Sequence, residues 1–361
     1  MATLASLPAA DIEQLFSGRD FAKPRINLDG QTILITGGTG SFGKRFLKTV
    51  LAEYKPRKLI IFSRDELKQY EMAQEFSPAE HPCLRYFIGD VRDETRLDMA
   101  MRDVDIVVHA AALKHVPIAE YNPFECIKTN VIGAENVVRA AIKRDVKRVV
   151  ALSTDKAASP INLYGASKLA SDKIFTAAQH MGGRNGPIFS VVRYGNVIGS
   201  RGSVVPFFRK LIEDGATELP ITDARMTRFW ITLDQGVNFV LSSLEMAKGG
   251  EVFVPKIPSM SITELARAMA PDLPHKSIGI RPGEKLHEVM VPADDARQTV
   301  ELEDRYAILP AMDAELRVRY RADGARDVPE EFAYASDSNP EIMDARALQG
   351  LVEERLKALR A

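Results

Sequence analysis

An α/β fold, built on a doubly wound parallel sheet with a smaller C-terminal lobe, is predicted by two features of the sequence. Between residues 31 and 194, short apolar runs rich in β-branched residues alternate with helix-compatible stretches. This alternation is typical of a parallel sheet with helices on both faces. After residue 194 the alternation ends, and Pro and Gly become scattered. The chain has 361 residues, which leaves room for a second lobe at about 100 to 200 residues per domain.

The individual elements follow from local pattern. A first βαβ unit is expected from a strand at 32–36, a helix at 42–53 and a strand at 58–62, because an apolar run, a glycine turn and a helical stretch follow one another there. Further strands are expected at 85–88, 106–109, 148–153 and 188–193, with a helical stretch at 123–144. In the C-terminal part we expect a helix at 234–247 and a strand at 251–255.

The composition argues against several classes of protein and partner. Hydrophobic residues make up 45% and charged residues 27% of the chain, as in ordinary globular domains. The net charge of -1 provides no field to attract a polyanion, so we expect no nucleic-acid partner. Cys83 and Cys126 are too few for a disulfide framework, which favours the reducing cytoplasm. No apolar run before residue 26 is long enough for a signal peptide or a membrane span, so we expect no membrane attachment.

A glycine-rich loop lies between the first expected strand and the first expected helix. Gly37, Gly40 and Gly43 have the spacing of a dinucleotide-binding loop, in which the main chain must turn tightly and approach a pyrophosphate at the start of a helix. The strand, loop, helix and second strand together predict a Rossmann fold that binds a nicotinamide dinucleotide. The expected contacts of the loop also include Thr39, Ser41 and Phe42.

The end of the second expected strand should select the form of the cofactor. Asp65 could accept a hydrogen bond from a 2′-hydroxyl, which would indicate NAD, whereas Arg64 and Lys68 offer donors for a 2′-phosphate. We favour NADP. The remaining cofactor contacts are expected from Ser63 and from the ends of the third and fourth strands, at Asp90, Val91, Ala110 and Ala111.

Tyr164 and Lys168 form the expected reaction centre. They are four residues apart in a helix-compatible stretch, so both side chains lie on one helix face. Because the pKa of tyrosine is about 10 in water, a neighbouring cation must lower it before the phenol can take a proton from a substrate hydroxyl. Tyr54 and Lys58 have the same spacing, but Pro56 between them argues against a helix.

The glycine loop, the small residues at 109–112 and Tyr164-x-x-x-Lys168 together resemble the extended short-chain dehydrogenase/reductase family. Within that family, the chain is similar to the inverting UDP-N-acetylglucosamine 4,6-dehydratases, which open pseudaminic acid biosynthesis. The motifs that carry this second similarity are Ser-Arg-Asp-Glu-Leu-Lys at 63–68, Ala-Leu-Lys-His-Val at 112–116, Ser-Thr-Asp-Lys-Ala-Ala at 153–158 and Arg-Pro-Gly-Glu-Lys at 281–285. The similarity extends from about residue 28 to residue 339 and includes 292–296 and 334–337.

The resemblance implies roles for Thr154, Asp155 and Lys156. Dehydratases that retain the C5 configuration typically carry Asp-Glu at the last two positions, where this chain has Asp-Lys. Tyr164 would deprotonate the C4 hydroxyl while hydride passes to NADP. Lys156, if neutral, would then take the C5 proton, and Asp155, if protonated, would help water to leave C6. Return of hydride to C6 and a proton delivered to the opposite face of C5 would invert that centre. Burial would have to move both groups away from their usual protonation states.

The resemblance also implies UDP-N-acetylglucosamine as the substrate. Its contacts would be Lys114 near the sugar, Asn196, Val204 and Thr222 near the nucleotide, and Arg281 and Glu284 on the uridine or diphosphate. The nicotinamide end of the cofactor would be covered by Val197, Ile198, Gly199 and Arg201. His115 and His287 have no metal-ligand partners at sensible spacing, so we expect no metal.

These assignments divide the chain and leave two alternatives open. The expected parts are an N-terminal arm (1–26), an NADP-binding Rossmann domain (27–195) on which 229–255 packs back, a substrate-binding lobe (196–228 and 256–340) and a C-terminal helix (341–361). A homo-oligomer is expected, as in many such families. A retaining dehydratase or a C4/C5 epimerase would use the same cofactor machinery without a lysine at position 156. The second alternative is a non-catalytic NADP-binding scaffold.

Overall fold

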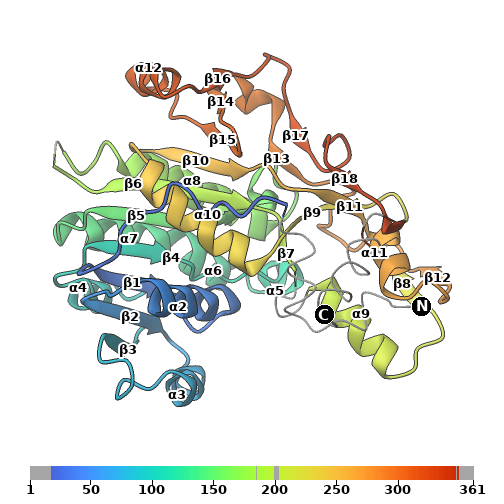
Figure 1. The fold of residues 1–361 in the computed structure, drawn as a ribbon, viewed down its shortest axis with the longest axis horizontal. Coiled ribbons are helices and arrows are strands. Elements are labelled where there is room, and N and C mark those ends of the chain that lie inside the picture. The colour runs from blue at the N-terminus through green and yellow to red at the C-terminus, as the bar shows by residue number, and fades with distance from the viewer. Residues whose placement is uncertain (1–17, 184, 199–202, 347, 349–361) are drawn as a thin grey trace, which may run out of the picture.

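The computed structural model describes residues 18–183, 185–198, 203–346 and 348, and these are organised around one large sheet (Figure 1). Its parallel strands are β1 (Thr32–Thr36), β2 (Lys58–Ser63), β3 (Leu84–Ile88), β4 (Ile106–His109), β5 (Arg148–Thr154), β6 (Ile188–Tyr194) and β10 (Glu251–Pro255). In space they follow the order β3-β2-β1-β4-β5-β6-β10, and each pairs in parallel with its neighbours. The predicted α/β fold with a doubly wound parallel sheet is confirmed.

Helices cover both faces of this sheet (Figure 1). On one face α2 (Ser41–Glu53) packs beside α10 (Leu233–Met246), and on the other α7 (Gly133–Lys143) packs between α4 (Glu94–Ala100) and α8 (Leu163–Ala178). The remaining helix of this half, α3 (Glu66–Glu75), follows β2 at the edge of the sheet. Every residue of β1 is buried, which explains why this strand reads as a continuous apolar run instead of an alternating one.

The helical stretch predicted at 123–144 is interrupted. It consists of α6 (Pro123–Ile127), a π-helical turn η2 (Lys128–Ile132) and α7, and it follows the short helix α5 (Val116–Tyr121). Within the π-helical turn, Asn130 accepts a hydrogen bond from Leu113 N at 2.8 Å and donates one to Leu113 O at 2.9 Å. The extra residue of a π-helical turn points an amide side chain at the segment that leaves β4, and such turns are frequent at functional sites.

Residues 299–327, which the sequence analysis assigns to the smaller lobe, extend the main sheet. Here β15 (Arg305–Ile308) pairs antiparallel with β10, and β14 (Thr299–Glu301) and β16 (Arg326–Asp327) follow, with α12 (Ala314–Ala322) between β15 and β16 in the chain. The buried Arg305 side chain donates to Ser242 and Ser243 of α10 and lies over the Phe239 ring. Strands this short carry too few residues for an alternating pattern to be read from the sequence.

The second lobe contains its own small sheet and core. The sheet has the order β18-β11-β9-β7, formed by β7 (Asn196–Val197), β9 (Thr227–Ile231), β11 (Ser259–Ser261) and β18 (Ile342–Met343). Around it lie α9 (Val204–Glu213), α11 (Ile262–Met269) and the parallel pair β8 (Leu219–Ile221) and β12 (His275–Ser277). Trp230, Phe208 and Met260 are buried at the centre of this lobe.

The two predicted terminal segments are described only in part. Most of the C-terminal helix expected at 341–361 lies outside the described residues, and its first part forms β18 instead, because Ile342 and Met343 pair with β11. Of the expected N-terminal arm (1–26), residues 18–26 are described. Phe21 packs edge-on against Phe239 of α10, with 5.2 Å between ring centroids. Arg19 pairs with Glu341 at 2.6 Å, so this stretch joins the two lobes.

Candidate active site

The glycine loop has the shape of an anion cradle at the start of α2. Gly37 has a φ of +66°, and a Cβ atom there would lie 2.8 Å from the Ala111 backbone, so only glycine fits. Within the described structure, the N-cap Gly40 offers no side-chain acceptor to α2 and the first turn carries no acidic residue. The first N–H groups of this helix therefore remain open to an anion. A dinucleotide diphosphate fits these residues.

At the end of β2, the Asp65 side chain is held by hydrogen bonds, whereas the Arg64 side chain is largely exposed. Asp65 caps α3: its Oδ1 accepts from Lys68 N at 3.0 Å and its Oδ2 lies 2.7 Å from Lys68 Nζ. These hydrogen bonds with Lys68 lower the pKa of the Asp65 carboxyl. Arg64 is 54% exposed and reaches Asp90 only at 3.6 Å. The carboxylate is thus occupied by the helix cap, and the Arg64 guanidinium faces the surface.

A cavity of about 910 Å³ opens where the carboxyl ends of the parallel strands face the second lobe. It brings together residues that the sequence analysis took from distant segments: Phe42, Ala110, Lys114, Thr154, Lys156, Tyr164, Lys168, Asn196, Val197, Val204, Thr222, Arg281 and Glu284. Asp155 and Ile198 are buried behind its wall. Gly199 and Arg201 lie outside the described residues. The cavity lining does not include the predicted cofactor residues Gly37, Thr39, Gly40, Ser41, Gly43, Ser63, Arg64, Asp65, Lys68, Asp90, Val91 and Ala111.

A close contact between two short elements places Tyr164 beside Thr154. The chain leaves β5 at Thr154, forms the 3₁₀ turn η3 (Asp155–Ala157) and enters α8 with Asn162 as N-cap, which accepts from Gly165 N at 2.7 Å. A Cβ atom on Gly165 would lie 2.2 Å from Lys156 O. The absence of a side chain at position 165 therefore lets the first turn of α8 pack directly on η3.

Burial and two neighbouring side chains act in opposite directions on the pKa of Tyr164. Tyr164 is 8% exposed, and burial raises its pKa to about 12, although the Lys156 charge and a hydrogen bond with Thr154 act to lower it. Lys168 was expected to supply the tuning charge. In the structure its Nζ instead donates to Leu152 O at 2.8 Å, because the i, i+4 position on α8 brings it over the end of β5. Burial lowers the pKa of the Lys168 amine.

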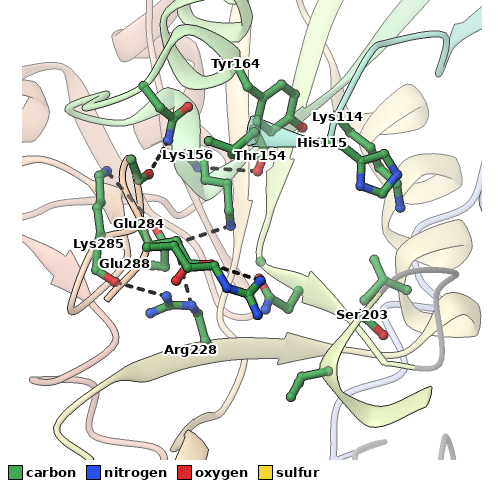
Figure 2. A pocket seen from close by; sticks show the side chains of 18 of the residues that line it. Lys114, His115, Thr154, Lys156, Tyr164, Ser203, Arg228, Glu284, Lys285 and Glu288 are labelled. Carbon is green, nitrogen blue, oxygen red and sulfur yellow. Dashed lines mark hydrogen bonds and ion pairs between the residues drawn. The ribbon is translucent and has the colours of Figure 1, made fainter. Parts of the chain in front are cut away.

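Lys156 lines the cavity and lies between the carboxylates of Asp155 and Glu288. Figure 2 shows it beside Glu288. Its Nζ is 3.0 Å from Asp155 Oδ1 and 3.3 Å from Glu288 Oε1. Burial alone would lower the pKa of Lys156, but the negative charges of Asp155 and Glu288 outweigh burial and raise it. The role that the resemblance implies for Lys156 requires a neutral amine, whereas the raised pKa favours the protonated amine.

The loop at 281–285 lines one part of the cavity. Asn162 Nδ2 donates to Gly283 O at 2.7 Å, which ties the loop to the start of α8. Arg281 is 58% exposed and its Nη1 lies 3.8 Å from Glu284 Oε1. Lys114 faces the same space from the segment after β4, and burial lowers its pKa. Arg281 and Lys285 of the loop, together with Lys114, thus present three cationic side chains to the cavity, and Glu284 presents one carboxylate.

Comparison with known proteins assigns the chain to a family. The family described as "Polysaccharide biosynthesis protein" matches residues 33–310. The chain belongs to this family. A UDP-N-acetylglucosamine 4,6-dehydratase (inverting) from Campylobacter jejuni subsp. jejuni serotype O:2 is 61% identical over 315 residues, which cover 86% of this chain and 93% of the relative. The resemblance inferred from short motifs is confirmed, as is the prediction that the chain is an enzyme.

The chain is also similar to proteins that are named for another activity. A UDP-glucose 4-epimerase from Rickettsia canadensis is 42% identical, over 91% of this chain and 98% of the relative. Among solved structures, Pen from Bacillus thuringiensis has a TM-score of 0.82 and 37% identity, and the match covers 92% of this chain and 99% of that one. The fold is therefore shared across the family, and the reaction has to be argued from the site.

Two buried charged residues of the site were missed by sequence reasoning. Glu288 is 1% exposed, and its Oε1 lies 3.7 Å from Arg228 Nε. Arg228 also donates to Lys285 O at 3.0 Å. One signal was available: Arg228 is a charged residue directly before the apolar run Phe229–Ile231 of β9. Glu288 follows the 281–285 motif with no pattern of its own, so only the fold brings it to Lys156.

The described residues also bear on two expectations from the sequence, that the protein binds no metal and that it has no membrane attachment. In the described part of the chain, no cluster of three or more His, Cys, Asp or Glu residues has the arrangement of a metal site. His287 instead shares a 2.8 Å hydrogen bond with the Thr227 hydroxyl. No described helix combines the length and apolar character needed to cross a bilayer.

Proposed function

We propose that this chain is an NADP-dependent UDP-N-acetylglucosamine 4,6-dehydratase that inverts C5. The observation that carries the proposal is the Lys156 amine, which lies 3.0 Å from Asp155 and lines the same cavity as Tyr164. An elimination needs one base for the C4 hydroxyl, a second base for C5 and an acid for the leaving hydroxyl. A C4 epimerase needs only the first, so the Asp155–Lys156 pair favours dehydration over C4 epimerisation.

The protonation states required for elimination are one proton transfer away from the observed pair. If Lys156 Nζ gives a proton to Asp155 Oδ1, the N–H bond breaks, an O–H bond forms, and both groups become neutral. The net charge of the site does not change. A sugar that fills the cavity excludes water and thereby disfavours the ion pair relative to the neutral pair. Substrate binding therefore supplies a neutral amine and a protonated acid together.

The residues then act in sequence. Tyr164 removes the proton from the C4 hydroxyl. When bound, the nicotinamide ring accepts hydride from C4 and returns it to C6. Lys156 removes the C5 proton, which the C4 ketone has made acidic, and Asp155 protonates the hydroxyl that leaves C6 as water. Delivery of a proton to the opposite face of C5 gives UDP-2-acetamido-2,6-dideoxy-β-L-arabino-hex-4-ulose, which would enter pseudaminic acid biosynthesis.

The choice of NADP is supported by how the charges at the end of β2 are used. The Asp65 carboxylate caps α3 and pairs with Lys68, so binding a ribose hydroxyl would compete with the cap. Arg64, which is largely exposed, is placed to meet a 2′-phosphate.

Replacing Arg64 tests this choice. We expect Arg64→Ala to weaken NADP binding by roughly tenfold or more, because a charge-assisted contact to phosphate is lost, and to leave NAD binding nearly unchanged. Titration of the purified protein with each dinucleotide measures both affinities. Arg57→Ala is a matched control, since Arg57 is 52% exposed but pairs with Asp105 near the opposite ends of the strands. Equal losses for NAD and NADP would overturn the NADP assignment.

UDP-N-acetylglucosamine is proposed as the substrate because the 281–285 loop and Lys114 offer cations for a diphosphate, and because the Campylobacter relative is named for this substrate. A cytoplasmic location is consistent with a nucleotide-sugar substrate and with two free cysteines, Cys83 and Cys126.

The decisive experiment is incubation of the enzyme with UDP-N-acetylglucosamine in deuterated buffer, followed by NMR of the products. We expect a 4-keto-6-deoxy sugar with deuterium at C5 and inverted configuration there. A retaining dehydratase would give the same ketone with unchanged C5 configuration. An epimerase would give a C4 isomer that keeps its C6 hydroxyl. If the protein turns over no substrate, the remaining alternative is the non-catalytic NADP-binding scaffold.

A further inference from the structure

Glu288 is a buried carboxylate that the proposed reaction does not yet use. It lies just before β13 (Val289–Val291), and its main chain is held from both sides by Ser336, next to β17 (Tyr334–Ala335). Glu288 N donates to Ser336 Oγ at 2.9 Å, and Ser336 N donates to Glu288 O at 2.8 Å. Ser336 is itself fully buried. The position of the carboxylate is therefore set by the fold.

The charged groups around Lys156 come from four segments. Asp155 belongs to η3 and Tyr164 to α8. Arg228 lies in β9, and Lys285 and Glu288 come from the segment before β13 (Figure 2). Glu288 Oε1 is 3.3 Å from Lys156 Nζ and 3.7 Å from Arg228 Nε, and Glu288 Oε2 is 4.0 Å from Lys285 Nζ. With Lys156 charged, three cations face two carboxylates in this cluster. With the proton on Asp155 and Lys156 neutral, two cations face the single carboxylate of Glu288, and the net charge of the cluster is the same.

We propose that Glu288 is a positioning residue for Lys156: its carboxylate holds the amine at the cavity wall and stabilises the positive charge that Lys156 gains when it removes the C5 proton. This inference rests on the proposed function. In the step concerned, the C5–H bond breaks and an N–H bond forms on Lys156. The C–H electron pair moves into the C5–C6 bond as the C6–O bond breaks, and Asp155 gives its proton to the departing hydroxide.

Two physical arguments support the role. A lysine amine sits on a flexible four-carbon stem, so a second acceptor 3.3 Å away restricts it to one place. A fixed carboxylate in a site closed to water also stabilises a cation that forms during the reaction, without reorganising at that moment. Asp155 cannot do both, because in the reacting state it holds the proton for the leaving group. Glu288 is the remaining carboxylate paired with Lys156.

The test is the pH dependence of deuterium incorporation at C5 in Glu288→Gln. Removing the charge beside Lys156 lowers the pKa of the base, so the pH at which the C5 exchange rate is half-maximal should fall by about one unit or more. The maximal rate should fall by roughly tenfold or more, because the developing cation loses its partner. The KM for UDP-N-acetylglucosamine should stay close to that of the unmodified enzyme.

Lys285→Gln provides the opposite change and decides the matter if Glu288→Gln does not fold. Without the Lys285 charge, the negative charge of Glu288 raises the pKa of Lys156 further. The pH at which the C5 exchange rate is half-maximal should therefore rise. Glu301→Gln is the control, because Glu301 pairs with Lys256 at 2.8 Å in the main sheet, and it should shift nothing. A Glu288→Gln profile that coincides with that of the unmodified enzyme would overturn the role of Glu288, as would shifts in the same direction for Glu288→Gln and Lys285→Gln. Failure of the unmodified enzyme to place deuterium at C5 would instead refute the proposed function itself.

Discussion

Lys156→Ala should abolish dehydration and trap the enzyme with reduced cofactor. Without the amine, the C5 proton has no acceptor, and loss of a general base lowers a rate by roughly 10² to 10⁴. The Tyr164 phenol remains, so oxidation at C4 should still proceed, although more slowly because the Lys156 charge that acts to lower the pKa of Tyr164 is lost. Mixing the variant with NADP and UDP-N-acetylglucosamine should therefore produce the near-ultraviolet absorbance of reduced nicotinamide without the 4-keto-6-deoxy product. Affinity for NADP should be unchanged.

A control must separate this loss from general damage, because the substitution leaves Asp155, which is fully buried, without its cationic partner. Lys156→Met keeps most of the side-chain volume and should behave like Lys156→Ala. Lys276→Ala removes an exposed lysine that pairs with Glu218 at 2.7 Å in the second lobe, and it should turn over at the normal rate. Normal turnover by Lys156→Ala would remove lysine from the mechanism.

Tyr164→Phe should block the reaction one step earlier. The phenol is the group placed to take the C4 hydroxyl proton, so its loss should lower turnover by roughly 10² to 10⁴, and no reduced cofactor should form. Because burial holds the pKa of Tyr164 at about 12, the phenolate is the minor form at neutral pH. The rate of C4 oxidation in the unmodified enzyme should therefore rise with pH wherever this step limits turnover.

Tyr54→Phe is the matched control for this variant. Tyr54 stands four residues before Lys58, as Tyr164 does before Lys168, but it lies at the end of α2 while Lys58 begins β2. Its loss should change neither turnover nor the absorbance trace. Accumulation of reduced cofactor by Tyr164→Phe would show that another group accepts the C4 proton.

The main sheet could be predicted from sequence because most of its parallel strands, including β1, β4 and β10, are buried. The expected bounds of β1, β4 and β10 agree with the structure, since each is a short apolar run between turn signals. The strands at 299–327 could not be assigned to the sheet, because β14 and β16 are too short to show a pattern. Their place is set by long-range pairing with β10 and by the burial of Arg305.

The site was predictable where chemistry is concentrated in one segment. Thr154, Asp155, Lys156 and Tyr164 lie close together in the sequence, and the structure brings them to one cavity wall. The electrostatics were not predictable, because the pKa of Lys156 depends on Glu288, which reaches it from a distant segment. The hydrogen bond from the Lys168 amine to Leu152 O likewise could not be predicted from the spacing of Tyr164 and Lys168.

The contact of Gly165 with Lys156 O, at the junction of η3 and α8, has a consequence for how such enzymes can diversify. Both proposed proton acceptors belong to one short unit of the Rossmann half, whereas Asn196, Val204 and Thr222 come from the other lobe. Substitutions in that lobe can therefore exchange one nucleotide sugar for another without altering the spacing between the two bases. We expect new substrate preferences in this family to arise there, and changes of reaction type to arise within η3.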